Sequence, residues 1–337
     1  MRPTSYLGLD IGSTSIKLVE LRATAGVPEL ATYGMVTVPT LPAARQYDTG
    51  QLAATVATLL KQSRATARGV YSALPTESVF TSIITVPQGN AKAVAAAVHT
   101  EAAKLLPRPI DEMVLDPQQL SVSADKHSVR ILLVAAPREL VERYDTICRL
   151  AGIELLGLEV ESFAMVRSLV GKDPASVAIV DFGATTTDII VVANGVPVLS
   201  RSVRIGGRDL TSALQSVLGV DVALAEQAKR DAGLAAGNVG LAGVYKKTIE
   251  PVVHELRYTL DTYFEQSQRR VEKIILTGGS SLLVGLPEYI FQETGLRTFV
   301  GNPWSRVRYP LELEKVLSET AGQFSVAIGL ALRPFKS

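Results

Sequence analysis

Two short segments of the sequence join a strand-ending aspartate to glycine and small hydroxyl residues. The first segment, residues 7–21, reads LGLDIGSTSIKLVEL. Apolar residues alternate on both sides of the turn, which is typical of a β-hairpin. The turn consists of Gly12, Ser13, Thr14 and Ser15. Glycine lets the backbone approach an anion closely, so this turn can bind phosphate, while Asp10 can hold a hydrated magnesium ion. Taken alone, a Gly-Ser-Thr turn after an aspartate is more often just a hairpin.

A second copy of this pattern lies at residues 177–192 and reads VAIVDFGATTTDIIVV. When Asp181 is placed on Asp10, the small residues that follow also align. They are Gly183, Ala184, Thr185 and Thr186. Repetition of a whole supersecondary unit indicates a duplicated domain with two facing hairpins. Two such turns can hold the phosphates of a nucleotide, with both aspartates flanking a metal ion and Lys17 neutralising phosphate charge.

A third glycine-containing turn follows a short apolar strand near the end of the chain. Residues 273–277 read KIILT, and the turn after them consists of Gly278, Gly279, Ser280 and Ser281. Glycines at a strand-to-helix turn let the backbone lie against a flat ring or a ribose. The order along the chain is therefore two aspartate-glycine hairpins and then a strand-glycine-glycine turn.

This ordered set resembles the superfamily of actin, Hsp70 and the sugar kinases, whose two phosphate hairpins and adenosine loop correspond to these segments. Within it, the chain is similar to the PilM family of type IV pilus assembly proteins and, more distantly, to the FtsA family of cell-division proteins. The segments that carry the closer match are LDIGSTSIKLVEL at 9–21 with the preceding Leu7–Gly8, LLVAAPRELVERY at 132–144, LEVESFAMVRSL at 158–169 and VRIGGRDLT at 203–211. The match covers nearly the whole chain.

The resemblance implies roles for further residues. Glu161 and Thr186 would lie near the attacking water, and Asp188 would help to hold the waters of the metal ion. Glu226 and Lys229, three positions apart on one helix face, would reach the ribose and adenine. Gly206 and Gly207 complete the expected nucleotide contacts. Two simpler interpretations remain open: Glu161 as a solvated carboxylate at a helix start, and the Glu226–Lys229 pair as a surface salt bridge.

The resemblance also implies an α/β, two-lobe actin-like (ribonuclease H-like) fold with an FtsA/PilM-type inserted subdomain in the first lobe. Alternating strand and helix patterns favour the same layered class. The expected divisions are the first lobe at 1–75, the insert at 76–158, a connecting helix at 159–172, the second lobe at 173–318, and a C-terminal helix returning to the first lobe at 319–337.

Apolar periodicity predicts the elements inside these divisions. The insert is expected to contain strands at 78–86 and 129–135 and helices at 91–106 and 137–150. Further helices are expected at 159–170, 246–268 and 319–332, and a proline-containing connection at 39–48.

Composition places the chain in a reducing compartment without a strongly charged partner. Its 337 residues suit two lobes. The 34 Lys plus Arg against 33 Asp plus Glu leave a formal net charge of +1, so the composition does not indicate a nucleic-acid partner. Cys148 is the single cysteine, so an intramolecular disulfide is excluded. The N-terminus shows no signal pattern, and the apolar runs are too short to span a membrane. We therefore expect a cytoplasmic protein.

The function implied by the resemblance is a cytoplasmic scaffold of type IV pilus assembly that binds ATP or ADP with Mg²⁺. The groove between insert and first lobe would receive the N-terminal cytoplasmic peptide of a PilN-like inner-membrane protein, and membrane contact would come only through partners. Other pilus platform proteins and self-association are further expected contacts. Hydrolysis should be weak at most, because neither Glu161 nor Thr186 is shown by the sequence to orient a water.

Three alternatives stay open. The insert would merely cover a sheet edge in the simplest case. An FtsA-like filament-forming protein would share these motifs but would usually carry an amphipathic tail, whereas this sequence stops at ALRPFKS. A small-molecule kinase of the same superfamily would need a substrate-deprotonating carboxylate, and none is evident between Pro75 and Leu158.

Overall fold

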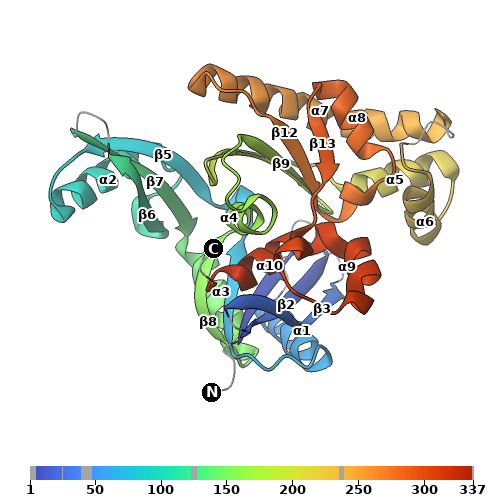
Figure 1. Cartoon of the computed structure of the whole chain (residues 1–337), viewed down its shortest axis with the longest axis horizontal. Coiled ribbons are helices and arrows are strands. Elements are labelled where there is room, and N and C mark those ends of the chain that lie inside the picture. Colours follow the sequence, from blue (N-terminus) through green and yellow to red (C-terminus); the bar gives the residue numbers. More distant parts are fainter. Residues whose placement is uncertain (1–4, 25, 39–47, 123–126, 235–238, 336–337) are drawn as a thin grey trace.

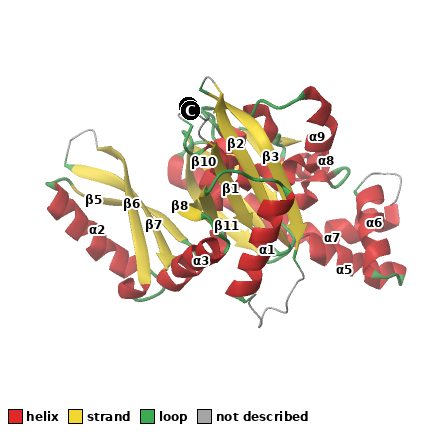
Figure 2. Cartoon of the chain, turned by 90° about the horizontal axis from the view of Figure 1, so that it is seen from below, coloured by secondary structure: helices red, strands yellow, loops and turns green. Residues whose placement is uncertain are grey.

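The computed structural model describes residues 5–24, 26–38, 48–122, 127–234 and 239–335. The expected connection at 39–48 therefore lies outside the described residues except for Asp48. Two five-stranded sheets with their helices form two lobes, and a three-stranded sheet projects beside them (Figures 1 and 2). The two-lobe α/β prediction is confirmed.

Both large sheets have the same strand order. The first-lobe sheet runs β3-β2-β1-β4-β8, and the second-lobe sheet runs β11-β10-β9-β12-β13. In each, the central strand pairs antiparallel with the strand that follows it in the chain and parallel with a later one. The duplication that the two aspartate-glycine segments indicate thus extends to the whole sheet.

The first lobe places α1 and α3 on one face of its sheet. Its elements are β1 (Ser5–Ile11), β2 (Ser15–Thr24), β3 (Val27–Thr37), α1 (Thr49–Gln62), β4 (Gly69–Leu74), α3 (Arg138–Leu150) and β8 (Glu154–Val160). Apolar side chains of α1 and α3, among them Val56, Leu59 and Ile147, pack on Leu7, Leu9 and Val70 of the sheet. Burial of this apolar surface holds β1 and its turn in place.

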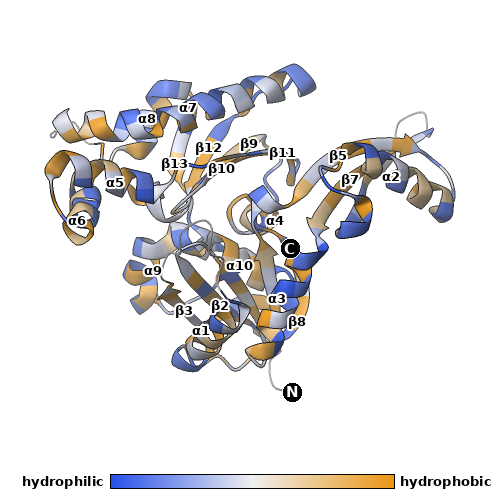
Figure 3. Ribbon diagram, turned by 180° about the vertical axis from the view of Figure 1, so that it is seen from behind, coloured by the Kyte–Doolittle hydropathy of each residue, from blue (hydrophilic) through white to orange (hydrophobic). Residues whose placement is uncertain are grey.

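The second lobe has the same sheet covered by different helices. Its elements are β9 (Val177–Phe182), β10 (Thr187–Ala193), β11 (Val196–Val203), α5 (Gly207–Leu218), α6 (Val222–Ala232), α7 (Val239–Ser267), β12 (Lys273–Thr277), α8 (Leu286–Thr294) and β13 (Arg297–Val300). The longest helix, α7, begins before the expected residue 246 and lies on the outer side of the lobe, where it carries many hydrophilic residues (Figure 3).

The insert is an antiparallel sheet with one covering helix. It consists of a 3₁₀ turn, η1 (Thr76–Ser78), then β5 (Phe80–Pro87), α2 (Ala91–Leu105), β6 (Met113–Val122) and β7 (Ser128–Pro137), in the order β5-β7-β6. Its core contains Ile84, Val86, Val98, Ala102, Val129, Ile131 and Leu133. The sequence pattern missed β6, because this edge strand contains Pro117 and several polar residues.

The expected end of the insert at 158 is wrong. β8 pairs in parallel with β4, so Glu154–Val160 completes the first-lobe sheet. The helix α3, also assigned to the insert, packs against α1 and buries Ile147 and Cys148 in the first-lobe core. The insert thus ends with β7. The connecting helix expected from 159 starts instead as α4 (Glu161–Met165), because the preceding residues are still in β8.

The final helix is buried between the lobes. In place of one helix over 319–332, the chain forms α9 (Glu314–Thr320), a 3₁₀ turn, η7 (Ala321–Phe324), and α10 (Ser325–Leu332). Every residue of α10 is buried, and the helix packs against β1 and α4 (Figures 1 and 3). A Cβ on Gly8 would lie 2.0 Å from the Ala327 oxygen, and one on Gly329 would lie 1.9 Å from the Ala164 oxygen. Glycine therefore permits the contact.

We expect Gly329→Ala to lower the free energy of unfolding by about 1–3 kcal/mol, because the added methyl group meets rigid backbone. Chemical denaturation measures this change. The control is Gly243→Ala in α7, where an added Cβ meets nothing within 4 Å and should stabilise the helix by up to about 1 kcal/mol. Equal stability of Gly329→Ala and wild type would contradict the close packing of α10.

Candidate functional site

The two aspartate-glycine turns have the same backbone geometry and face each other. The Gly12 N–H donates to the Ser15 carbonyl over 3.0 Å, and the Gly183 N–H donates to the Thr186 carbonyl over 2.9 Å. Between the two lobes, the Thr185 hydroxyl donates to the Ser13 hydroxyl over 3.1 Å. The structure therefore brings the two candidate phosphate turns together, one from each lobe.

The residue that pairs with the hairpin aspartate is a cation in the first hairpin and an anion in the second. Asp10 lies opposite Lys17 in the β1–β2 pairing, and Asp181 lies opposite Asp188 in the β9–β10 pairing. The Lys17 ammonium is 2.9 Å from the Asp10 carboxylate, and both side chains are largely buried. The first hairpin thus holds an ion pair where the second holds two carboxylates.

A fourth carboxylate joins this group from the connecting helix. Glu161 is the first residue of α4, and its Oε2 accepts a hydrogen bond of 3.3 Å from the Thr76 N–H. Burial, together with the charges of Asp10, Asp188 and Asp181, raises the pKa of Glu161 well above its usual value. The cleft therefore favours the interpretation of Glu161 as part of the site over that of a solvated helix-start carboxylate.

The crowding of carboxylates alters the protonation of the site. Burial and the neighbouring charge of Asp188 raise the pKa of Asp181 to about 7. Burial raises the pKa of Asp188 to about 6, against a hydrogen bond from Ser202 that lowers it. Burial disfavours the charged form of Lys17, but Asp10 and the other carboxylates outweigh it and raise the Lys17 pKa. The site carries excess negative charge that a cation would relieve.

The candidate metal residues offer carboxylate oxygens, the ligand type that magnesium prefers. Within the described ranges, no group of three or more His, Cys, Asp and Glu side chains is arranged to hold a metal ion. Magnesium usually keeps several of its waters and contacts few protein carboxylates. Asp10, Asp181 and Asp188 supply carboxylate oxygens of the kind that such an ion contacts.

The second turn is fixed to the start of α5 and to the third glycine turn. The Gly207 N–H donates to the Gly183 carbonyl, and the Arg208 N–H to that of Ala184, each over 2.9 Å. A Cβ added at Gly206 would lie 2.6 Å from the Ala184 backbone. One at Gly207 would lie 2.4 Å from the Ser280 hydroxyl, and one at Gly278 would lie 2.3 Å from the Asp181 carboxylate. Glycine at these three positions lets three backbone segments meet at one side of the cleft.

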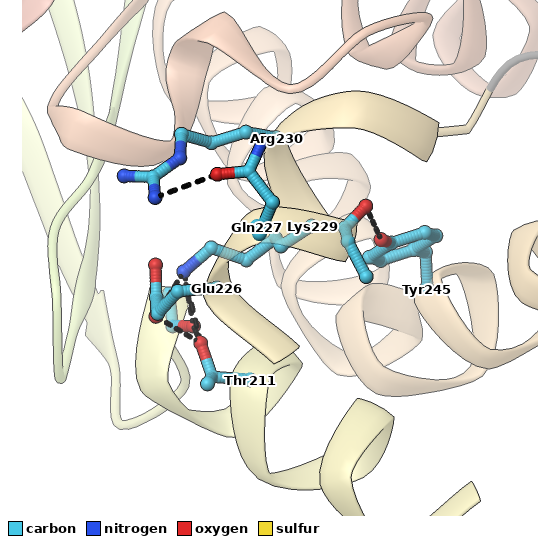
Figure 4. Close-up of polar contacts among 8 residues, drawn as sticks. Thr211, Glu226, Gln227, Lys229, Arg230 and Tyr245 are labelled. Atoms are coloured by element: carbon cyan, nitrogen blue, oxygen red, sulfur yellow. Dashed lines mark hydrogen bonds and ion pairs between the residues drawn. The ribbon is translucent and has the colours of Figure 1, made fainter. Parts of the chain in front are cut away.

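Glu226 and Lys229 form a polar network beside these glycines (Figure 4). The Lys229 ammonium donates to Glu226 over 2.8 Å, to the Thr211 hydroxyl over 2.9 Å and to the Gly207 carbonyl over 3.0 Å. Thr211 also donates to Glu226. Although burial acts in the opposite direction, hydrogen bonds from Lys229 and Thr211 lower the Glu226 pKa. The pair therefore joins α6 to the start of α5 and is more than a solvated surface salt bridge.

Some residues of this site were not found from the sequence. Thr211 is the last residue of VRIGGRDLT, one of the segments that carry the family match. Its place in that segment was the only feature of the sequence that pointed to it. Ser202 and Thr76 had no signal, since they reach Asp188 and Glu161 only through tertiary contacts. Among the predicted residues, Thr14 contributes a carbonyl to the Val38 N–H, and Gly279 is exposed at the third turn.

The comparison with protein families gives the class of the chain. A family model described as type IV pilus assembly protein PilM matches residues 8–335. The chain belongs to the PilM family.

Solved structures agree with this assignment. The protein of a PilM–PilN type IV pilus biogenesis complex is 28% identical, covers 98% of this chain and 99% of its own, and has a TM-score of 0.85. Two more distant structures show the same fold alone. Ethanolamine utilization protein EutJ from Carboxydothermus hydrogenoformans is 17% identical, with a TM-score of 0.59 and coverage of 100% and 91%. MreB5 of Spiroplasma citri bound to AMPPNP is 12% identical, with a TM-score of 0.58 and coverage of 96% and 94%.

None of the helices in the described ranges is long and apolar enough to cross a membrane.

The raised pKa of Asp181 predicts a pH-dependent stability. Between the ordinary aspartate pKa of 3.8 and the folded value of about 7, the folded state binds more protons than the unfolded state. The contribution of this group to stability is therefore complete below the lower value and lost as pH rises through the upper one. We expect the free energy of unfolding, measured without divalent cations, to fall from about pH 5 to about pH 8.

Asp181→Asn should flatten this slope, since the amide does not titrate. The control Asp145→Asn, on the exposed face of α3, should keep the wild-type slope. Identical slopes in wild type and Asp181→Asn would show that the carboxylates do not repel one another as described.

Proposed function

We propose that this protein is a nucleotide-dependent scaffold of type IV pilus assembly. It binds ATP or ADP with magnesium between the two hairpin turns and docks the N-terminal cytoplasmic peptide of a PilN-like inner-membrane protein. Through that partner it sits on the cytoplasmic side of the inner membrane. The observation that carries the nucleotide part is the pair of matched turns, joined by the Thr185–Ser13 hydrogen bond, beside a cluster of carboxylates of which Asp10 and Asp188 are buried and Asp181 and Glu161 are half-buried.

Each part of a nucleotide has a matching part of the site. Backbone N–H groups and hydroxyls of the two turns would hold phosphate oxygens, and Lys17 would supply a compact positive charge. Asp10, Asp181 and Asp188 would accept hydrogen bonds from the waters of the metal. Magnesium, when bound, neutralises phosphate charge. The glycine turns at 206–207 and 278–280, with Glu226 and Lys229, would hold the ribose and adenine.

We expect hydrolysis to be weak at most. The candidate base Glu161 already accepts a hydrogen bond from the Thr76 N–H, so one of its oxygens is engaged by the backbone. The Thr186 carbonyl accepts the Gly183 N–H and closes the turn. The Thr186 hydroxyl is not basic enough to deprotonate a water. The site is therefore better equipped to hold a nucleotide than to activate a water.

Asp10→Asn tests the nucleotide site. Isothermal titration should show saturable binding of ATP to wild type in magnesium, and binding at least about tenfold weaker in the variant, because a charge-assisted contact to the hydrated metal is lost. Asp116→Asn, on the exposed surface of the insert, should bind like wild type. Thermal unfolding of each variant must first show that it is folded. Failure of nucleotide-stripped wild type to bind ATP would remove this part of the proposal.

The docking part is supported by the junction between insert and first lobe. Ala136 of β7 packs with Leu74 and Tyr144 of the first lobe, and Arg138 donates to the Met113 carbonyl of β6. β6 is an edge strand, and its Val114, opposite Ala136, leaves 36% of its surface exposed. An edge strand with an exposed apolar side chain can receive an extended peptide. The similar PilM–PilN complex supports a PilN-like peptide as that partner.

Val114→Asp should weaken binding of a PilN-like N-terminal peptide at least about tenfold, because a charge would be placed against the apolar face of the peptide. Fluorescence anisotropy with a labelled peptide measures the change. Val217→Asp is the control, since Val217 is 59% exposed on α5 of the second lobe. Unchanged affinity in Val114→Asp would place the peptide elsewhere, and an equal loss in both variants would indicate non-specific apolar binding.

A further inference from the structure

The short turn η1 connects three parts of the protein. It follows β4 of the first lobe, leads into β5 of the insert, and contacts β11 of the second lobe. Its Thr76 N–H is bound to Glu161 over 3.3 Å. The charge of Glu77 raises the pKa of Asp188, after the larger effect of burial. η1 therefore lies beside carboxylates from both lobes, at the root of the insert.

The side chain of Thr76 is unusual within this turn. Thr76 is only 8% exposed, and its hydroxyl is buried without a hydrogen-bond partner in the structure. A buried hydroxyl without a partner is destabilising, since it has lost its contacts with water. Such atoms are rare: within the described ranges, only two other buried side-chain atoms lack a partner, Thr259 Oγ1 and Trp304 Nε1. This unpaired hydroxyl belongs to the residue whose N–H binds Glu161, one of the four carboxylates of the candidate site.

We infer that Thr76 is a positioning residue of the nucleotide site, whose hydroxyl gains its hydrogen-bond partner when a nucleotide with its hydrated metal fills the cleft. Its backbone N–H meanwhile holds Glu161 in place. This inference rests on the proposed nucleotide binding. Because η1 continues directly into β5, occupation of the site also restrains the root of the insert, where the peptide is proposed to dock.

Two substitutions separate the effect of this hydroxyl from that of the side-chain shape. Thr76→Val removes it and retains the shape of the side chain, while Thr76→Ser keeps it. The matched control is Thr259→Val, which removes another buried, unpaired hydroxyl from α7. Affinity for ATP with magnesium is measured by isothermal titration, and the midpoint of thermal unfolding is measured without nucleotide.

The inference predicts opposite effects of Thr76→Val on the free and bound protein. Without nucleotide, the unfolding midpoint should rise, because an unsatisfied buried hydroxyl is removed. Affinity for ATP should fall about fivefold to tenfold, since one hydrogen bond is lost. Thr76→Ser should retain affinity within about twofold. Thr259→Val should raise the midpoint and leave affinity unchanged.

A readout on the insert completes the test. Hydrogen exchange of the amides in η1 and the first residues of β5 should slow when ATP with magnesium binds to wild type, and should slow less in Thr76→Val.

Other outcomes would overturn the inference in distinguishable ways. Wild-type affinity in Thr76→Val, with saturable binding to wild type, would overturn the role of Thr76 and leave the proposed function standing. A lower unfolding midpoint in nucleotide-free Thr76→Val would show that the hydroxyl already has a structural partner. Absence of ATP binding to folded wild type would overturn both the inference and the nucleotide part of the proposed function.

Discussion

Repulsion among four carboxylates, two buried and two half-buried, is the constraint on which the region between the two hairpins depends. The four lie close together and are those of Asp10, Asp181, Asp188 and Glu161. Burial and their charges raise the pKa values of Glu161 and Asp181, and these charges favour the charged form of the Lys17 ammonium. Isolated charges are rarely buried without compensation, because water stabilises them far better than protein does. The structure compensates in part with the Lys17–Asp10 ion pair and in part by raised pKa values. The remaining negative charge of the carboxylates favours binding of a cation, such as the metal ion of the proposed ligand.

The surrounding packing keeps these like charges together. Asp10 lies on β1, which is held between β2 and β4 and covered by α10, and the close contact at Gly8 leaves β1 little room to move away. In the second lobe, Gly278 brings β12 against Asp181. Apolar burial over both sheets thus supplies the free energy that holds the carboxylates in place. A cation bound at this site would relieve repulsion that folding imposes.

The sequence revealed what is local and repeated. Both hairpins were predictable because alternating apolar residues flank a glycine turn, and their duplication appears again as equal strand order in the two sheets. β8 was missed because it is an edge strand whose last residues run directly into α4, so its pattern resembled a helix start. In the site, the Glu226–Lys229 pairing follows from spacing on one helix, whereas the contacts of Thr76 and Ser202 depend on how separate elements pack. No local pattern records such contacts.

The central claim is that a metal-bound nucleotide relieves the carboxylate repulsion, and proton release measures it most directly. ATP is titrated into the protein near the pKa values of about 6 and about 7 of Asp188 and Asp181, in two buffers of different ionisation enthalpy, with magnesium and with chelator. A nearby cation lowers the pKa of a carboxyl, so binding with magnesium should release more protons than binding without it. Equal release in both conditions, or proton uptake with magnesium, would contradict the account.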